Sequence, residues 1–373
     1  MNIPLVDLKA QYQSIKTEVD AAIHRILDNT AFIMGKEVSS FETAFADYAG
    51  CKYAIGVSNG TEALLLPMVA LDIRPGDEII TTPLTFIATV EPVMQLGARP
   101  VFVDIDPRTY NIDVDQIEAA ITERTKAILP VHLYGQPANM PRIQEIAQKH
   151  NLVIIEDAAQ AHGARFAQQP VGQWGVATGF SFYPGKNLGA YGDAGAIITD
   201  NADMAAKLNQ LRDHGSSSKY EHVVVGYNAR IDALQAAILG VKLNYIQSWT
   251  EARRQRAAWY NEALADMPGV ITPFEHPDAY HVYHLYVIQV AGDRDAILRY
   301  LHEQGIGAGI HYPTPVHLQP ALAELGYRTG DFPKAEAIAR SIISLPLYPE
   351  LTQEQVVRVA QAVGEATRIQ QHA

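Results

Sequence analysis

Cysteine is almost absent from this sequence, with Cys51 the only one among 373 residues. A single thiol excludes an internal disulfide and any metal site of the Cys-x-x-Cys type, and it fits a reducing compartment. The 13 histidines show no His-Glu-x-x-His motif or comparable spacing of metal ligands. We therefore expect no metal site.

Long apolar runs and basic runs are missing as well. No uncharged apolar stretch reaches the roughly 18 residues that a membrane-spanning helix needs, and the first ten residues carry charges instead of a signal-peptide core. The formal net charge is −12, and no basic run offers a sequence-independent grip on nucleic acid. We expect a cytoplasmic protein that binds neither a membrane nor nucleic acid.

Apolar residues, by contrast, make up 48% of the chain, enough for a full core in one large and one smaller domain. Short apolar runs rich in β-branched residues predict seven strands, at 53–58, 78–82, 100–104, 126–132, 152–156, 178–182 and 194–199. Stretches with helical spacing separate most of them, at 61–72, 85–96, 113–121 and 140–150. This alternation predicts an α/β fold with a mainly parallel, doubly wound seven-stranded sheet, whose ligands bind at the carboxyl ends of the strands.

The pattern changes in the last third of the chain. An apolar stripe over 230–262 predicts one long helix that connects two domains. Beyond it we expect a strand at 282–290, a helix at 293–305, a strand at 307–312 and a last helix that opens at 351–355. The sequence thus predicts a large domain over 1–240 and a small α+β domain over 241–373.

One lysine, Lys186, lies between glycine-bearing turns in "SFYPGKNLGAYGDAGAIIT", residues 181–199. A phosphate-binding loop of the Walker type would need Gly-x-x-x-x-Gly-Lys followed by Ser or Thr, and here the glycine spacing is wrong and Asn187 follows. The glycines at 189–195 lead into a strand, not from a strand into a helix, so they are a weak dinucleotide signal. An exposed loop lysine and a covalent catalyst are the interpretations that remain.

Other polar residues follow two predicted strands. Glu156 and Asp157 come directly after the apolar run "LVII", and we expect both acids over the ligand crevice, although Asp157 could instead cap a helix. The turn "SNGT", residues 58–61, ends another strand and opens a helix, which offers backbone N–H groups and a hydroxyl to an anion. A plain capped turn is the alternative there.

A lysine, an acid and an anion cradle at three strand ends meet the needs of pyridoxal phosphate. The lysine amine condenses with the aldehyde, the carboxylate keeps the pyridine nitrogen protonated, and the N–H and hydroxyl groups hold the phosphate. Each feature is ambiguous alone, but the three together indicate this cofactor.

The motifs also resemble a known family. "EDAAQAHGA", "SFYPGKNLGAYGDAGA", "VGYNARIDALQAAIL" and "GIHYPTPVHLQPAL" occur in the order found in the DegT/DnrJ/EryC1/StrS sugar aminotransferases, and the resemblance runs from residue 3 to about residue 365. It implies an aspartate aminotransferase-like fold (PLP fold type I) and a homodimer whose two active sites each use both subunits.

The resemblance also implies roles for individual residues. Lys186 matches the Schiff-base lysine and Asp157 the partner of the pyridine nitrogen. The other positions that match cofactor ligands are Gln160 at the 3-hydroxyl, Gly60, Thr61 and Ser181 at the phosphate, Phe86 over the ring, and Asn228 from the partner chain. Substrate-binding positions are Tyr183, Arg230, His311 and Tyr312, although Phe86 could simply pack in the core and His311 could lie in an exposed turn.

Lys186 also bears on the reaction. Related dehydratases carry histidine at its position, so the resemblance implies transamination, with L-glutamate as the amino donor and a dTDP- or UDP-linked keto sugar as the acceptor. Tyr183 stands where relatives that act at C4 tend to carry histidine, which favours C3 of a 3-keto hexose. A C4 aminotransferase and a non-catalytic regulatory protein that binds pyridoxal phosphate are the alternatives.

Overall fold

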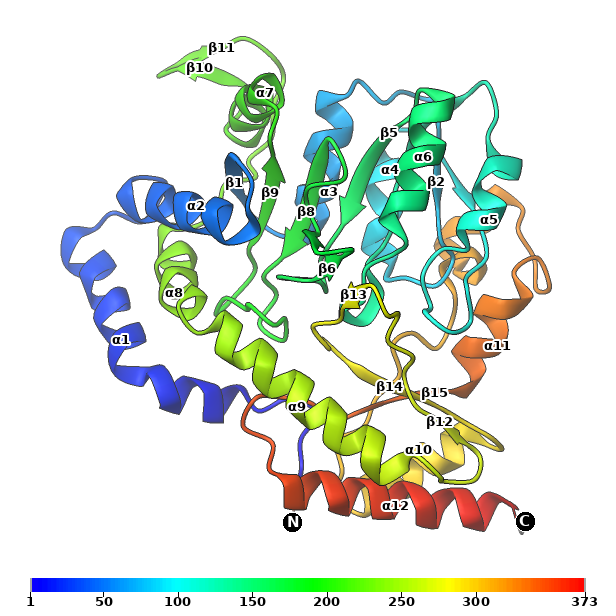
Figure 1. The fold of residues 1–373 in the computed structure, drawn as a ribbon. Helices are drawn as coiled ribbons and strands as arrows, with labels where there is room; N and C mark the ends of the chain where they lie inside the picture. The colour runs from blue at the N-terminus through cyan, green and yellow to red at the C-terminus, as the bar shows by residue number, and fades with distance from the viewer. Residues whose placement is uncertain (1, 372–373) are drawn as a thin grey trace.

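The computed structural model describes residues 2–371, in which a seven-stranded sheet forms the centre of the larger part (Figure 1). Its order is β1-β9-β8-β5-β4-β2-β3, and only β9 runs antiparallel to its neighbours. The strands are β1 (Tyr53–Val57), β2 (Glu78–Thr81), β3 (Arg99–Phe102), β4 (Thr125–Ile128), β5 (Val153–Asp157), β8 (Ala177–Ser181) and β9 (Gly195–Thr199). The seven predicted strands and the mainly parallel sheet are confirmed.

Helices cover both faces of this sheet (Figure 1). They are α2 (Lys36–Ala49), α3 (Gly60–Ala70), α4 (Glu91–Gln95), α5 (Val114–Ile117), α6 (Met140–His150), α7 (Ala202–Arg212) and α8 (Ala233–Leu243), and α1 (Leu8–Asn29) lies outside this layer, against α8. The predicted helices at 85–96 and 113–121 are each shorter, because a 3-10 turn takes part of the segment, at Ile87–Thr89 and at Glu118–Ala120.

The predicted single helix over 230–262 is wrong. Asn244 ends α8, and a second helix, α9 (Ile246–Leu264), begins after Tyr245. Both segments carry apolar stripes, so the sequence pattern runs through the break without showing it.

A second, smaller sheet of order β12-β14-β15 lies below the first in Figure 1, beside α9 and α12. Its elements are β12 (Val270–Ile271), β14 (Tyr286–Val290), α10 (Arg294–Glu303), α11 (Pro333–Ser341), β15 (Ile342–Leu345) and α12 (Gln353–Gln371). The strand predicted at 307–312 is wrong, because the described segment forms only one isolated bridge, between Gly309 and Ser344. The division of the chain at residue 240 stays a prediction.

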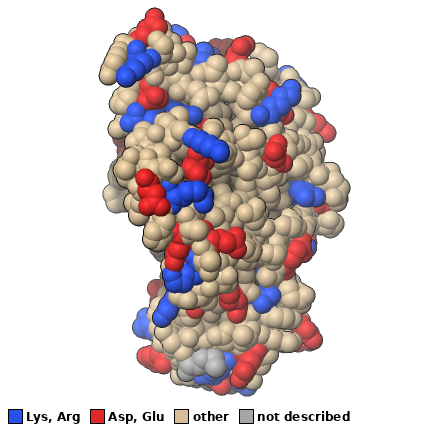
Figure 2. Space-filling view, turned by 90° about the vertical axis from the view of Figure 1, so that its left-hand side faces the viewer, with Lys and Arg blue, Asp and Glu red and all other residues tan. Residues whose placement is uncertain are grey.

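Short strand pairs complete the described structure. One sheet joins β6 (Arg165–Phe166), β7 (Gln169–Pro170) and β13 (Ala279–Tyr280), and the hairpin of β10 (Ser216–Ser218) and β11 (Glu221–His222) projects from the body beside α7 (Figure 1). None of the described helices is both long enough and apolar enough to cross a bilayer. On the face seen in Figure 2, acidic and basic side chains are interspersed.

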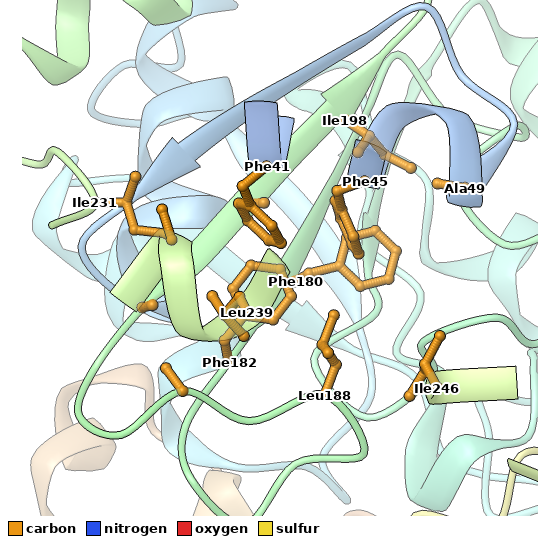
Figure 3. Packing of buried hydrophobic residues seen from close by; sticks show 14 of the residues in the cluster. Phe41, Phe45, Ala49, Phe180, Phe182, Leu188, Ile198, Ile231, Leu239 and Ile246 are labelled. Atoms are coloured by element: carbon orange, nitrogen blue, oxygen red, sulfur yellow. The ribbon is translucent and has the colours of Figure 1, made fainter. Parts of the chain in front are cut away.

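An aromatic cluster fixes the strand that leads to the predicted lysine. Phe180 and Phe182 pack against Phe45 from α2, each with ring centroids 5.2 Å apart, and all three are buried (Figure 3). Since side chains alternate along a strand, Ser181 between them points to the opposite face. The cluster therefore determines which residue of this strand end can reach a ligand.

Candidate active site

A cavity of about 590 Å³ lies where β5 and β8 end, between the two sheets. It brings together ten of the twelve predicted site residues, and the other two, Asn228 and Arg230, lie outside it. The ten are Gly60, Thr61, Phe86, Asp157, Gln160, Ser181, Tyr183, Lys186, His311 and Tyr312.

Lys186 lies in the loop after β8, where its backbone N–H donates to the carbonyl of Tyr183 at 2.8 Å. The loop folds back tightly, because a Cβ at Gly189 would stand 2.3 Å from the carbonyl oxygen of Pro184. Burial lowers the pKa of the Lys186 amine to about 8, and the charge of Asp157 acts in the opposite direction. A larger share of this amine is therefore neutral at pH 7 than for an ordinary lysine, as an amine that attacks a carbonyl requires.

Asp157 ends β5 and is 6% exposed. Its carboxylate accepts hydrogen bonds from Thr89 Oγ1 at 2.8 Å and from the backbone N–H of Ala159 at 3.1 Å. The helix-cap alternative is wrong, because residues 158–164 form turns instead of a helix. The carboxylate is thus held in place at the cavity without a cation bound to it in the described structure.

Glu156, in contrast, does not reach the cavity, and its predicted place over the crevice is wrong. Its side chain leaves the opposite face of β5 and is fully buried. There it accepts hydrogen bonds from His132 Nε2, Thr178 Oγ1 and the backbone N–H groups of Gly172, Trp174 and Gly175, all at 3.0–3.1 Å. The alternation of side chains along a strand separates two adjacent acids, one to the cavity and one to a supporting loop.

The start of α3 forms the anion cradle. Asn59 caps the helix by accepting the N–H of Glu62 at 2.9 Å, and among the described residues the N–H groups of Gly60 and Thr61 have no partner. Gly60 has no room for a side chain, because a Cβ there would stand 2.6 Å from the Cβ of Ser181. The Ser181 hydroxyl therefore lies against the helix N-terminus, a donor set that fits a phosphate group.

Another wall of the cavity consists of Gln160 and the aromatic rings of Phe86 and Tyr312. Gln160 accepts the N–H of Tyr134 at 2.6 Å and donates to the Tyr312 hydroxyl at 3.2 Å. The Phe86 and Tyr312 rings lie 5.5 Å apart, and Phe86 is 53% exposed, which contradicts the core-packing alternative for it.

His311 is held beside this wall. Its Nδ1 lies 2.8 Å from Ser344 Oγ, which contradicts the exposed-turn alternative. Burial and, second, the charge of Lys186 lower the pKa of His311 to about 4, so the ring is neutral at pH 7.

Asn228 and Arg230 lie in the loop before α8, away from the cavity of their own chain. Arg230 binds the Asn228 side-chain oxygen at 2.7 Å and forms an ion pair with Asp213 at 2.5 Å. The loop is bridged to β1 through Val57, which holds both side chains near the surface.

Several cavity residues were not predicted from the sequence. Thr89 binds Asp157, Arg253 and His284 line the side nearest the small sheet, and Leu5 and Val6 enter from the start of the chain. Nothing in the local sequence indicates their roles, because each reaches the cavity through long-range packing.

Three comparisons with known proteins agree with this geometry. The family model of the DegT/DnrJ/EryC1/StrS aminotransferase family matches residues 13–364. The chain is 48% identical to a pleiotropic regulatory protein of Geobacillus stearothermophilus, with 99% of each chain covered. It is 45% identical to a UDP-N-acetyl-3-dehydro-alpha-D-glucosamine 3-aminotransferase of Acidithiobacillus ferrooxidans, with 97% of each chain covered.

Solved structures give the same result. DesV of S. venezuelae, in complex with a ketimine intermediate, aligns with a TM-score of 0.95 at 44% identity and 98% coverage of both chains. NtdA of Bacillus subtilis, with bound cofactor PMP, aligns with a TM-score of 0.87 at 34% identity, covering 94% of this chain and 82% of that one. The predicted aminotransferase fold and the resemblance are both confirmed: this chain belongs to the DegT/DnrJ/EryC1/StrS aminotransferase family.

Proposed function

We propose that the protein is a cytoplasmic aminotransferase that uses pyridoxal phosphate to move an amino group from L-glutamate to C3 of a dTDP- or UDP-linked 3-keto hexose. The observation that carries this proposal is the cavity itself, in which the Lys186 amine, the Asp157 carboxylate and the α3 cradle meet. The cofactor supplies an aldehyde that condenses with amines and a ring that withdraws electrons.

In this proposal, different residues of the cavity bind different parts of the cofactor. The N–H groups of Gly60 and Thr61 and the Ser181 hydroxyl bind its phosphate, while Asp157, oriented by Thr89, holds a proton on the ring nitrogen. Gln160 reaches the ring hydroxyl, and Phe86 covers one face of the ring.

Lys186 has two tasks in this proposal. Its neutral amine binds the cofactor, and once an amino donor has displaced it, the same amine moves a proton between the donor α-carbon and C4′ of the cofactor. A pKa lowered to about 8 suits both tasks, because the amine exchanges its proton readily near neutral pH.

Tyr183 supports the choice of C3 over C4, because it stands where relatives that act at C4 tend to carry histidine. The Acidithiobacillus relative, a 3-aminotransferase of a UDP-linked sugar, supports the same position. Tyr183, His311 and Tyr312 line the cavity, and we assign the binding of the sugar to them.

A homodimer with shared sites completes the proposal. Asn228 and Arg230 do not line the cavity of their own chain, and exposed apolar side chains occur near them, in sequence or through a backbone hydrogen bond: Phe32, whose carbonyl accepts the N–H of Ala233, is 48% exposed, and Val225 is 93% exposed. In a two-fold dimer these side chains are buried and Arg230 reaches the partner's cavity, where its planar fork suits a sugar diphosphate.

The regulatory relative supports one second candidate, a protein that binds pyridoxal phosphate without turnover. A single experiment separates the candidates: purified holoprotein is given L-glutamate with dTDP- or UDP-linked 3-keto and 4-keto hexoses, and the amino sugar is measured. We expect a 3-amino product. A 4-amino product contradicts the C3 assignment, and the absence of any turnover of L-glutamate supports the regulatory candidate.

A further inference from the structure

Arg253 is a buried cation whose role the proposed function does not explain. It extends from α9, which runs from beneath the seven-stranded sheet toward the small sheet, and it is 3% exposed (Figure 1). Among the described residues no carboxylate lies within 4.0 Å of its guanidinium; the charge of Glu350 acts on it only from a longer distance. Buried cations in proteins are normally paired, so an unpaired one indicates a missing partner.

One nitrogen of Arg253 carries all of its observed hydrogen bonds. Nη1 donates to the carbonyls of Leu347 at 2.9 Å and of Tyr283 and His284 at 3.3 Å. Nε is buried without a partner, and no hydrogen bond from Nη2 is found among the described residues. The hydrogen bonds to the backbone carbonyls therefore use Nη1 alone, and the two-donor edge formed by Nε and Nη2 has no hydrogen-bond partner in the described part of the chain.

The cavity identifies the chemistry that this edge can bind. Arg253 lines it together with the apolar residues Leu5, Val6 and Leu347, and its side chain is almost fully buried. Nε and Nη2 of an arginine present two parallel N–H groups that match the two oxygens of a carboxylate. Burial lowers the pKa of Arg253 to about 10, opposed by the charge of Glu350, so the group is still protonated at pH 7.

A phosphate or diphosphate fits this edge less well. Lys186 and Arg253 are the only lysine or arginine among the described residues that line the cavity, and Lys186 belongs to the cofactor. A group with several negative charges would find one cation here, whereas the α3 cradle and the outward Arg230 offer better phosphate sites. A single planar carboxylate matches both the charge and the shape of the free edge.

We propose that Arg253 forms a carboxylate subsite at the small-sheet side of the cavity, distinct from the α3 cradle. It binds the carboxylate of the amino donor, and the same chemistry would accept the carboxylate of a nucleotide-linked hexuronate. This inference rests on the proposed aminotransferase function for the identity of its ligand, and on the contacts of Arg253 for its place.

The test compares Arg253→Lys with Arg254→Lys in the holoprotein. Lysine keeps the positive charge but loses the two-donor edge, while Arg254, the next residue on the helix, pairs with Glu275 outside the cavity and serves as the matched control. Glutarate, an unreactive dicarboxylate, is titrated against the absorbance of the lysine-bound cofactor. We expect its Kd to rise at least about tenfold in Arg253→Lys, since one charge-assisted hydrogen bond is lost, and to stay unchanged in Arg254→Lys.

Half-reactions then identify the source of the carboxylate. Each variant is given L-glutamate, a nucleotide-linked neutral 3-amino hexose, or the corresponding 3-amino hexuronate in single-turnover experiments. A defect with L-glutamate that spares the neutral amino sugar supports the donor subsite, and a defect with the hexuronate alone assigns the same subsite to the sugar. An equal loss with all three, or unchanged glutarate binding, overturns the proposal.

A substitute variant and the glutarate titration cover two cases in which the main experiment would give no answer. If Arg253→Lys does not fold, as judged by its melting temperature, Arg253→Gln takes its place, because the amide still donates to the carbonyls. If wild-type protein uses neither L-glutamate nor a nucleotide sugar, the proposed function fails, whereas the glutarate titration still decides on Arg253.

Discussion

The hydroxyl of Thr89 donates a 2.8 Å hydrogen bond to Oδ2 of Asp157, and both groups are buried. Thr89 is in turn 2.6 Å from the hydroxyl of Thr85, so the carboxylate is oriented by a short chain of hydroxyl groups. The carboxylate can therefore hold a fixed direction toward a ring nitrogen.

Separate replacements of Asp157 and Thr89 distinguish the effect of the carboxylate's charge from the effect of its orientation. We expect Asp157→Asn to keep the yellow absorbance of the lysine-bound cofactor and to slow both half-reactions about 100-fold, because the charge that holds the ring proton is lost. Thr89→Val should slow them about tenfold, the value of one hydrogen bond to a charged group. Single-turnover rates measure both effects, and a near wild-type rate for Asp157→Asn would mean that the ring nitrogen lies elsewhere.

Lys186→Ala should remove the yellow absorbance and lower turnover by at least about 1000-fold, because the cavity then has no amine to bind the cofactor or to move the proton. Lys36, at the exposed start of α2, provides the control, and Lys36→Ala should keep full colour. Borohydride reduction followed by peptide mapping locates the modified lysine directly. A coloured, reducible Lys186→Ala protein would refute the assignment.

Gly60→Ala tests the anion cradle. The added Cβ would stand 2.6 Å from the Cβ of Ser181, so the strand end and the helix must move apart. We expect the affinity for pyridoxal phosphate to fall about tenfold or more, since overpacking costs about 1–3 kcal/mol. Equilibrium titration of the apoprotein measures it; an unchanged Kd would mean that the phosphate binds elsewhere.

The capture of pyridoxal phosphate by the apoprotein should depend on pH with a midpoint of about 8, the lowered pKa of Lys186. Only the neutral amine attacks the aldehyde, so the rate should rise about tenfold per pH unit below the midpoint and level off above it. Stopped-flow absorbance from pH 6 to 10 follows the reaction. A midpoint near the ordinary lysine value would show that burial does not act on this amine.

Mixed dimers test whether the active site is shared. In a shared site, a dimer of one Lys186→Ala and one Arg230→Ala subunit has one pocket with both lesions and one with neither. Random equal mixing should then restore about a quarter of wild-type activity. If Arg230 serves its own chain, every pocket keeps one lesion and the mixture stays inactive; subunit exchange is confirmed separately by mass spectrometry of differently tagged chains.

The sequence predicts the seven strands well because each is a short apolar run that leads into polar residues at its carboxyl end. It misplaces the break between α8 and α9, since the apolar stripe continues across Tyr245. It also predicts a strand at 307–312, but only Gly309 of this segment finds a bridge partner in the described structure.

For the site, the residues predicted at strand ends reach the cavity with the exception of Glu156, and the cavity residues Arg253, His284, Leu5 and Val6 were missed. Arg253 belongs to the segment that the sequence predicts as a helix connecting two domains, and only the fold directs it inward to the carbonyls of Leu347 and Tyr283. Long-range contacts of this kind leave no local pattern in one sequence.

The two adjacent acids at the end of β5 make this strand sensitive to its length. Glu156 binds the loop at 171–175 on one side, and Asp157 faces the cavity on the other. A deletion of one residue within β5 would move Asp157 to the loop side and bring Ala158 to the cavity, so that the cavity would lose its carboxylate. An insertion would bring Glu156 to the cavity and leave the loop without its acceptor. Engineering of this enzyme can therefore vary the length of surface loops such as the β10–β11 hairpin, but the length of β5 has to be kept.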